Sequence, residues 1–473
     1  MRNRPNILFL FSDQHNPSVL GHAGNRVINT PILDDLSRQA VTFENAYCQN
    51  PLCVPSRASL ITGRYSRNIG IYENQQILEP NCVTFPRVLS ASGYRTCLIG
   101  KSHFNGEQYH GYQARPYGDL YGQAHQPDPR RTPESGAAGL GGLIKNAGPS
   151  GIPLPLTQTE ICVAESAKWL QTHVDLHPDQ PFCLSVHFDK PHFPVRPPVE
   201  YFAKYDGRIN PPDVLEGYYD RAVPFVRRAM DRFASEDQDC ARYLAAYYGC
   251  VEWVDNAIGR LLQVLDYLEL SENTVVVYAS DHGDLCGDKG AWNKTLFFDS
   301  SAKVPLLIRY PGNFSAGLRV ANPVGLIDLF PTFCDLAQIS VSEECDGQSL
   351  MPLLTQTGMF DREEIYSESA FLGSPLDAGC MIRKGEWKYC YYRDGYEELY
   401  NLTEDPGEWN NLASHEAHRT IQDEFREKVI TFWRPEEYEE RLRNTPRVQR
   451  QKHFYEFSNQ FMLGSGTVAN GRP

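Results

Sequence analysis

The sequence lacks any long apolar run. No stretch approaches the roughly 20 consecutive apolar residues that a membrane-spanning helix requires. The apolar segment Asn6–Ser12 is too short for a signal peptide and is not followed by a small-residue cleavage site. We therefore expect no membrane association and a cytoplasmic location, or a periplasmic or secreted one if a leader precedes this chain.

Paired cysteine spacing is also absent. The 13 cysteines are an odd number, and none of them forms a Cys-x-x-Cys motif. This scattered spacing does not suggest a disulfide framework. We expect most of the thiols to be buried and reduced, as in a cytoplasmic protein.

Concentrated positive charge is missing as well. The chain has 45 lysines and arginines against 59 acidic residues, a net charge of −14, and no basic block. We therefore expect no nucleic-acid partner. An anionic substrate remains compatible with this charge, because a few Arg, Lys and His side chains can dominate the field inside a cleft.

What the chain does contain is an alternation of short apolar runs and helical patterns. The apolar runs predict strands buried on both faces: Asn6–Ser12, Val41–Cys48, Tyr94–Gly100, Phe182–Phe188, Thr274–Ser280 and Val304–Tyr310. Helical patterns lie between them, at Pro31–Ala40, Thr84–Ser92, Thr157–His173 and Cys240–Tyr267. The alternation predicts an α/β fold with a large, doubly wound mixed sheet flanked by helices.

The C-terminal part has a different pattern. Short strands precede a helix at about His415–Trp433, which is typical of an antiparallel sheet with one packed helix. We predict a large domain over residues 1–360 and a smaller α+β subdomain over residues 361–473, with a polar, weakly patterned tail from residue 435. The Gly- and Pro-rich segment Pro127–Pro155 predicts a long loop.

Polar side chains follow five of the predicted strands. The groups are Asp13-Gln14, the loop of Cys53, Lys101-Ser102-His103, Lys190-Pro191-His192 and Asp281-His282-Gly283. In open α/β sheets the ligand site lies outside the carboxyl ends of the strands. We therefore expect the five groups to converge on one cleft.

The loop of Cys53 leads directly into a predicted helix. A helix N-terminus presents free N–H groups and a positive dipole end, which attract an oxyanion. Arg57 adds a rigid fork of five donors. A nucleophilic Cys53 would face a bound sulfate or phosphate there, whereas the alternative is a buried cysteine before an ordinary Pro-started helix.

Two strand ends together offer oxygen-rich side chains. Asp13, Gln14, Asp281 and His282 supply two carboxylates, an amide oxygen and an imidazole, a set that suits a hard divalent cation. A single Asp after a strand is more often a cap or turn residue. Two such ends facing one anion-binding loop favour a metal site.

The motif Cys-x-Pro-Ser-Arg followed by Leu-Ile-Thr-Gly-Arg resembles the signature of the type I sulfatases of the alkaline phosphatase superfamily. The opening Arg-Pro-Asn-Ile-Leu and the later Ser-Asp-His-Gly-Asp are similar to the metal-binding segments of that family, and Gly-Glu-Trp-Lys-Tyr at 385–389 is similar to its C-terminal domain. The resemblance covers roughly residues 4–435. It is strongest toward choline sulfatase and bacterial carbohydrate sulfatases.

This resemblance implies hydrolysis of a sulfate monoester. A maturation enzyme would oxidise Cys53 to formylglycine, whose hydrate attacks the sulfate ester. The implied metal ligands are Asp13, Gln14, Cys53, Asp281 and His282, and the implied ion is calcium, with manganese or magnesium as alternatives.

The resemblance also implies roles for the basic residues. Arg57, Lys101 and Lys294 would hold the sulfate, and His103 would support the formylglycine hydrate. His192 or Lys294 would protonate the leaving alcohol, because departure of a poor alkoxide needs a general acid.

One departure from the family pattern leaves alternatives open. The commoner pattern has two adjacent acidic residues where this chain has Asp13-Gln14, and with His282 this is closer to choline sulfatases and to phosphonate monoester or phosphodiester hydrolases of the superfamily. Such a hydrolase is one alternative, and a non-catalytic sulfated-glycan binding protein is another. The sequence does not distinguish a sulfated carbohydrate from a small alkyl sulfate such as choline sulfate. A homo-oligomer is also one of the assemblies that we consider.

Overall fold

The computed structural model describes residues 4–74, 76–104, 108–118, 143–341, 344–370 and 378–444. Its centre is an eight-stranded sheet of order β4-β3-β5-β1-β6-β7-β2-β8. All these strands run in one direction except β7, which is antiparallel to both of its neighbours. The bounds are β1 Asn6–Asp13, β2 Val41–Tyr47, β3 Arg95–Gly100, β4 Ala114–Tyr117, β5 Phe182–Pro191, β6 Thr274–Ser280, β7 Leu306–Arg309 and β8 Arg319–Gly325.

The predicted mixed sheet is confirmed, and the two strands that the sequence did not predict lie at its edges. β4 has four residues, and β8 reads RVANPVG with its exposed and buried positions mixed. An edge strand is covered on fewer sides, so it does not need the continuous apolar run that marks a buried parallel strand.

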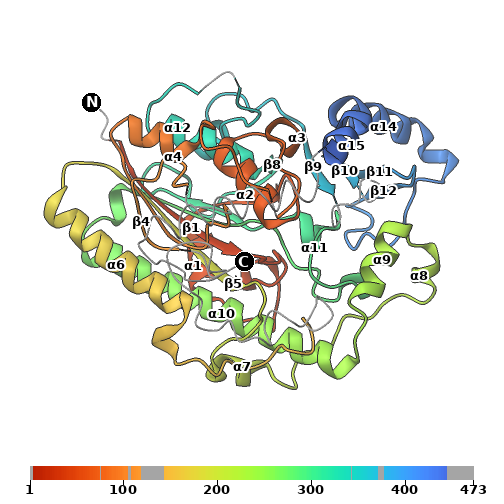
Figure 1. The fold of residues 1–473 in the computed structure, drawn as a ribbon, viewed down its shortest axis with the longest axis horizontal. Coiled ribbons are helices and arrows are strands. Elements are labelled where there is room, and N and C mark those ends of the chain that lie inside the picture. The colour runs from red at the N-terminus through yellow and green to blue at the C-terminus, as the bar shows by residue number, and fades with distance from the viewer. Residues whose placement is uncertain are drawn as a thin grey trace, which may run out of the picture.

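Helices cover both faces of the sheet (Figure 1). Alternate residues of β1 show the division, because Ile7 and Phe9 pack in one core with α2, α4 and α12, whereas Leu8 and Leu10 pack in another with α1, α6 and α10. These helices are α1 Pro31–Gln39, α2 Cys53–Thr62, α4 Phe85–Ala91, α6 Gln158–Leu176, α10 Asp237–Tyr267 and α12 Leu329–Leu336. The central strands are thus buried on both faces.

Shorter helices occupy the connections. They are α3 Ser66–Ile69, α7 Val199–Tyr205, α8 Tyr218–Arg221, α9 Pro224–Arg232, α11 Asp299–Ala302 and α13 Met351–Thr355. In the part of the chain that the structure describes, no helix is both long and apolar enough to cross a membrane. The predicted loop Pro127–Pro155 falls mostly outside the described residues.

The C-terminal part forms a second, antiparallel sheet of order β12-β11-β10-β9, at the upper right of Figure 1. Its strands are β9 Glu364–Ala370, β10 Ala378–Lys384, β11 Trp387–Tyr392 and β12 Glu397–Asn401, and α14 Arg419–Trp433 packs on them. The expected tail begins as a helix, α15 Pro435–Asn444, whose Tyr438 is buried against this core. The domain boundary at residue 360 stays a prediction.

Candidate functional site

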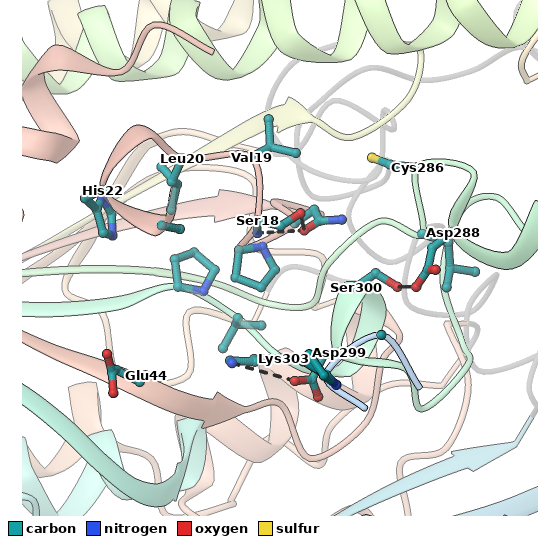
Figure 2. Close-up of a pocket in the computed structure, with 18 of the residues that line it drawn as sticks. Ser18, Val19, Leu20, His22, Glu44, Cys286, Asp288, Asp299, Ser300 and Lys303 are labelled. Carbon is teal, nitrogen blue, oxygen red and sulfur yellow. Dashed lines mark hydrogen bonds and ion pairs between the residues drawn. The ribbon is translucent and has the colours of Figure 1, made fainter. Parts of the chain in front are cut away.

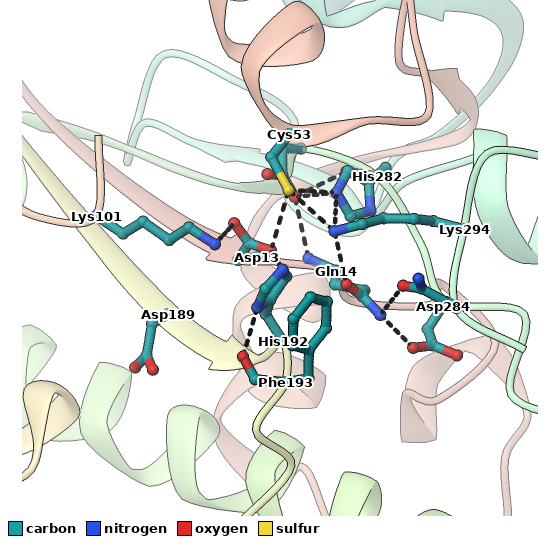
Figure 3. Close-up of polar contacts among 12 residues, drawn as sticks. Asp13, Gln14, Cys53, Lys101, Asp189, His192, Phe193, His282, Asp284 and Lys294 are labelled. Atoms are coloured by element: carbon teal, nitrogen blue, oxygen red, sulfur yellow. Dashed lines mark hydrogen bonds and ion pairs between the residues drawn. The ribbon is translucent and has the colours of Figure 1, made fainter. Parts of the chain in front are cut away.

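The carboxyl ends of four neighbouring strands meet at one place (Figure 3). β3, β5, β1 and β6 are adjacent in the sheet, so the residues that follow or end them lie side by side. Asp13 ends β1, Lys101 follows β3, His192 follows β5 and Asp281 follows β6. The backbone N–H of His192 donates to the Asp13 carbonyl over 3.1 Å, which ties two of these ends together.

Cys53 is the first residue of α2 and faces this convergence. Its Sγ atom lies 2.9 Å from Lys294 Nζ, 3.2 Å from His282 Nε2 and 3.9 Å from Asp13 Oδ1. The next backbone N–H, that of Val54, donates to Asn74 Oδ1 over 3.0 Å, so Asn74 uses one of the free donors of the helix N-terminus. The sulfur is therefore held among ionisable groups and away from solvent.

Four side chains form a group that can hold a metal ion. One ligand atom each from Asp13, Cys53, Asp281 and His282 lies within 4.8 Å of the others, and all four residues are buried. Two carboxylates and an imidazole suit a hard or borderline divalent cation. Gln14 adjoins the group through its backbone N–H, which donates to Asp281 Oδ1 over 3.0 Å.

Arg57 and Lys101 pair with the acidic members of this group. Arg57 donates from Nε to Asp281 Oδ2 over 2.9 Å and from Nη2 to Asp13 Oδ2 over 2.8 Å, and its Nη1 donates to the Lys101 carbonyl. Lys101 Nζ lies 2.8 Å from Asp13 Oδ2. The guanidinium thus fixes the spacing of the two carboxylates, while its contact with a sulfate stays a prediction. His103 is half-buried two residues beyond Lys101, with a φ of 54°, and its role also stays a prediction.

The thiol of Cys53 has an unusual electrostatic environment. Burial and the charge of Asp13 raise its pKa, but the positive charges of Lys294, Lys101 and His282 outweigh both effects. The pKa of Cys53 consequently lies well below its usual value. A thiolate is both the reactive and the metal-binding form of cysteine, so the surroundings favour a charged, reactive group at this position.

His192 is affected in the opposite direction. Burial, together with the charges of Lys101 and Lys294, lowers the pKa of its imidazole to about 3. Its Nε2 lies 3.8 Å from Asp13 Oδ1, and its ring stacks on Phe193 with centroids 3.9 Å apart. The imidazole is therefore neutral near pH 7 in this arrangement.

The sequence reasoning missed several residues of the site. Asn74 lies in a loop without a local pattern, and Asn293 and Asp284 contact the Gln14 amide. Asp284 belongs to the Ser-Asp-His-Gly-Asp segment, which is the one signal for it in the sequence. Tyr243 lies on α10, and a helical apolar stripe gives no sign that its hydroxyl reaches Asp284.

A separate cavity of about 740 Å³ lies beside the site (Figure 2). Asn16 and Leu285 are part of its lining and follow closely after the predicted metal-binding segments, and Glu408 and Trp409 also line it. None of the predicted catalytic or metal-binding residues is among the described residues that line it. This cavity therefore does not mark the predicted chemistry.

Comparison with known families gives two overlapping matches. The sulfatase family profile matches residues 5–339, and the profile described as the C-terminal part of N-sulphoglucosamine sulphohydrolase matches residues 287–434. The first match covers more than half of the chain and includes every predicted site residue.

Individual relatives align with nearly the whole chain. The choline-sulfatase of Rhizobium meliloti is 31% identical over 93% of this chain and 89% of its own. The ulvan-active sulfatase of Formosa agariphila is 30% identical over 90% of this chain and 80% of its own. Among solved structures, the phosphonate monoester hydrolase of Agrobacterium radiobacter superposes with a TM-score of 0.76 at 25% identity, covering 90% of this chain and 95% of that one.

Proposed function

Because this chain belongs to the sulfatase family, we propose that the buried cluster around Cys53 is where it hydrolyses sulfate monoesters. As a member of the family the chain is a sulfuric ester hydrolase, which sets aside the non-catalytic alternative. One observation carries the assignment of the site. Cys53 Sγ shares its surroundings with two carboxylates, an imidazole and the Lys294 ammonium, which come from the end of β1 and from the segment between Asp281 and Lys294.

The family implies a formylglycine and a divalent metal, and the residues present fit both. Cys53 stands at the required motif position, and Asp13, Asp281 and His282 supply a donor set suited to a divalent cation. We propose calcium as the ion, with Gln14 as a further ligand and manganese or magnesium as alternatives. When bound, the cation supplies positive charge that neutralises sulfate oxygens, and hydrated formylglycine supplies a hydroxyl nucleophile.

The remaining residues bind and orient the ester. Lys294 Nζ lies 2.9 Å from Cys53 Sγ and Lys101 Nζ lies 2.8 Å from Asp13 Oδ2, and we propose that both hold sulfate oxygens as negative charge develops on the leaving group. Arg57 keeps Asp13 and Asp281 in place for the metal. His103 is proposed to support the nucleophile.

Lys294 and His192 are both candidates for the proton donor. His192 is neutral near pH 7 because its pKa is lowered to about 3, so it must take up a proton before it can act as an acid. The Lys294 ammonium already lies 2.9 Å from Cys53 Sγ. We propose that Lys294 donates the proton and that His192 orients the bridging oxygen. If so, Lys294→Met should slow esters with poor leaving groups far more than nitrophenyl sulfate, and His192→Asn should not show this split.

The substrate is proposed to be a sulfated carbohydrate or a small alkyl sulfate such as choline sulfate. A choline-sulfatase and an ulvan-active sulfatase match the chain almost equally well, at 31% and 30% identity. Turnover of choline sulfate and of sulfated oligosaccharides, compared as kcat/KM, separates the two. We also propose a formylglycine-generating partner and a homo-oligomer. A cytoplasmic location is proposed because all 13 cysteines are free in the structure.

One experiment tests the assignment of the site and the reaction together. Mass spectrometry of the peptide that contains Cys53 should show conversion to formylglycine, and the converted fraction should scale with turnover of an aryl sulfate. Rates on an aryl phosphonate under the same conditions test the phosphonate hydrolase alternative, which the sulfatase relatives fit less well. Faster phosphonate than sulfate turnover would overturn the proposal.

A further inference from the structure

The side chain of Gln14 lies between two groups of opposite hydrogen-bonding character (Figure 3). Its Nε2 donates to Asp284 Oδ2 over 2.5 Å and to Asn293 Oδ1 over 3.1 Å. Its Oε1 accepts from Lys294 Nζ over 2.9 Å. Gln14 and Asp284 are fully buried, so water does not compete for these bonds.

These partners determine which end of the amide is the oxygen. An ionised carboxylate only accepts hydrogen bonds and an ammonium only donates them. Turning the Gln14 amide by 180° would place Oε1 against Asp284 Oδ2 and Asn293 Oδ1 and the NH₂ group against Lys294, which loses all three bonds and creates three repulsive contacts. The hydrogen-bond network therefore settles the orientation of the amide.

Asp284 is itself held rigidly. Its Oδ2 accepts a second hydrogen bond from the Tyr243 hydroxyl over 2.7 Å, and its Oδ1 accepts from the Cys286 backbone N–H over 2.7 Å. Tyr243 lies on the long helix α10. Asp284 is thus fixed from two sides, by α10, which contains none of the predicted metal ligands, and by its own loop, which also carries Asp281 and His282.

The backbone of Gln14 is fixed as well. Its N–H donates to Asp281 Oδ1, and its carbonyl accepts from the Tyr247 hydroxyl over 2.5 Å. The residue has a φ of 67°, a left-handed conformation that is uncommon outside glycine. Among the described contacts, both amide hydrogens and one Oε1 lone pair of Gln14 are used, which leaves the other lone pair for a ligand.

We infer that Asp284 is a positioning residue: it binds the NH₂ group of Gln14 and so turns Oε1 toward the metal-binding group. The inference rests on the proposal that Gln14 belongs to the metal site. The inference also explains how Gln14 can take the place of the second of the two adjacent acidic residues in the commoner family pattern. The carboxylate at position 284 lies behind the amide, where it sets the direction of a neutral oxygen ligand.

Calcium affinity of the metal-depleted protein, measured by competition with a chromogenic chelator, tests this inference. Asp284→Asn removes the acceptor-only partner and lets the Gln14 amide turn, so affinity should fall about 10- to 100-fold, as for other residues that orient a metal ligand. Gln14→Glu alone should also weaken binding, because two carboxylates then face each other at hydrogen-bond distance.

The double variant Gln14→Glu, Asp284→Asn supplies the rescue. The amide at 284 can donate to the carboxylate at 14, so affinity should recover to above that of either single variant. Tyr243→Phe keeps the Asp284 contact with Gln14 and should weaken binding only a few-fold. Asp255→Asn, a buried carboxylate on the same helix α10, is the matched control and should bind calcium as the wild type does.

Several results would overturn the inference. Wild-type affinity in Asp284→Asn together with weakened binding in Gln14→Ala would show that Asp284 does not orient the amide, and a double variant no better than the single ones would show the same. If Asp284→Asn fails to fold, Gln14→Glu and Tyr243→Phe still test the inference by the same measurement, because both should weaken calcium binding and wild-type affinity in both would overturn it. Failure of the wild type to bind any divalent cation would instead contradict the proposed function.

Discussion

Two buried clusters of charge in this protein look alike but do different things. One is the site around Cys53, and the other, which we call the subdomain clamp, consists of Tyr47, Asp299, Lys388 and Glu408. Lys388 is fully buried on β11 and donates to Asp299 Oδ1 over 2.5 Å, to Glu408 Oε1 over 2.7 Å and to the Phe297 carbonyl over 3.1 Å. Tyr47, the last residue of β2, donates to Asp299 Oδ1 over 2.9 Å, so the clamp joins the small sheet to the large one.

The difference lies in what the charged groups face. In the clamp, all three hydrogen bonds of Lys388 go to oxygen atoms of the protein itself. The charges of Asp299 and Glu408 raise the pKa of Lys388, although burial opposes this shift. At the site, Lys294 faces Cys53 Sγ and Gln14 Oε1, two atoms that we propose as metal ligands. Burial and perturbed pKa values therefore do not identify a catalytic cluster by themselves. We propose that convergence of possible ligand atoms on Cys53, the proposed nucleophile, identifies it here.

The largest effect should follow from removing that nucleophile. Cys53→Ala should lower turnover of an aryl sulfate by several orders of magnitude, because loss of a covalent nucleophile normally does so. Its melting temperature should stay close to that of the wild type. Cys48→Ala, a buried thiol five residues earlier, should remain active and is the matched control. More than about one hundredth of wild-type activity in Cys53→Ala would contradict the assignment.

The loss of a proposed metal ligand should have the next largest effect on turnover. Asp281→Ala should lose both the bound divalent cation and activity, since its carboxylate is shared between the metal-binding group and Arg57. Elemental analysis of the purified variant measures occupancy. Full occupancy would refute the ligand assignment, whereas retained metal in Asp255→Asn is expected.

The sequence predicts these site residues better than the contacts that support them. The strands β1, β5 and β6 are continuous apolar runs, so the sequence alone places their carboxyl ends together, and with them Asp13, His192 and Asp281. The edge strand β8 could not be predicted because an edge does not need such a run. Contacts such as Val54 with Asn74, or Asp284 with Tyr243, join segments distant in sequence, and no local pattern encodes which side-chain atoms meet.

Breaking the subdomain clamp should cost stability and spare the chemistry. Lys388→Met removes the cation that bridges Asp299 and Glu408 and leaves Asp299 with Lys303, whose Nζ lies 3.6 Å from Asp299 Oδ2. Removing one partner of a buried ion pair typically costs about 3–5 kcal/mol. Urea denaturation measures the loss, and kcat per folded molecule should be unchanged. Lys384→Met, at the exposed end of neighbouring β10, should cost less than about 1 kcal/mol. A large fall in kcat for folded Lys388→Met would mean that the two clusters are coupled.

A smaller effect on catalysis is expected at Lys101, whose ammonium lies 2.8 Å from Asp13 Oδ2. Sulfate and phosphate should inhibit competitively, because both reproduce the tetrahedral anion. Lys101→Ala should weaken this inhibition and lower kcat/KM by roughly 100-fold, as for loss of one donor to developing charge. Lys168→Ala, on the surface of α6, should change neither. Unchanged inhibition and turnover in Lys101→Ala would remove this lysine from the site.

The smallest effect should come from an ion pair that solvent reaches. Arg319 Nε lies 2.6 Å from Glu44 Oε1, but the two side chains are 52% and 38% exposed. Water and salt screen such a pair, so a double-mutant cycle of Arg319→Ala and Glu44→Ala should give a coupling free energy below about 1 kcal/mol, which fades in 1 M salt because the Debye length there is about 3 Å. Neither change should affect turnover. A coupling energy as large as that of the subdomain clamp would show that geometry, and not burial, sets the strength of ion pairs in this fold.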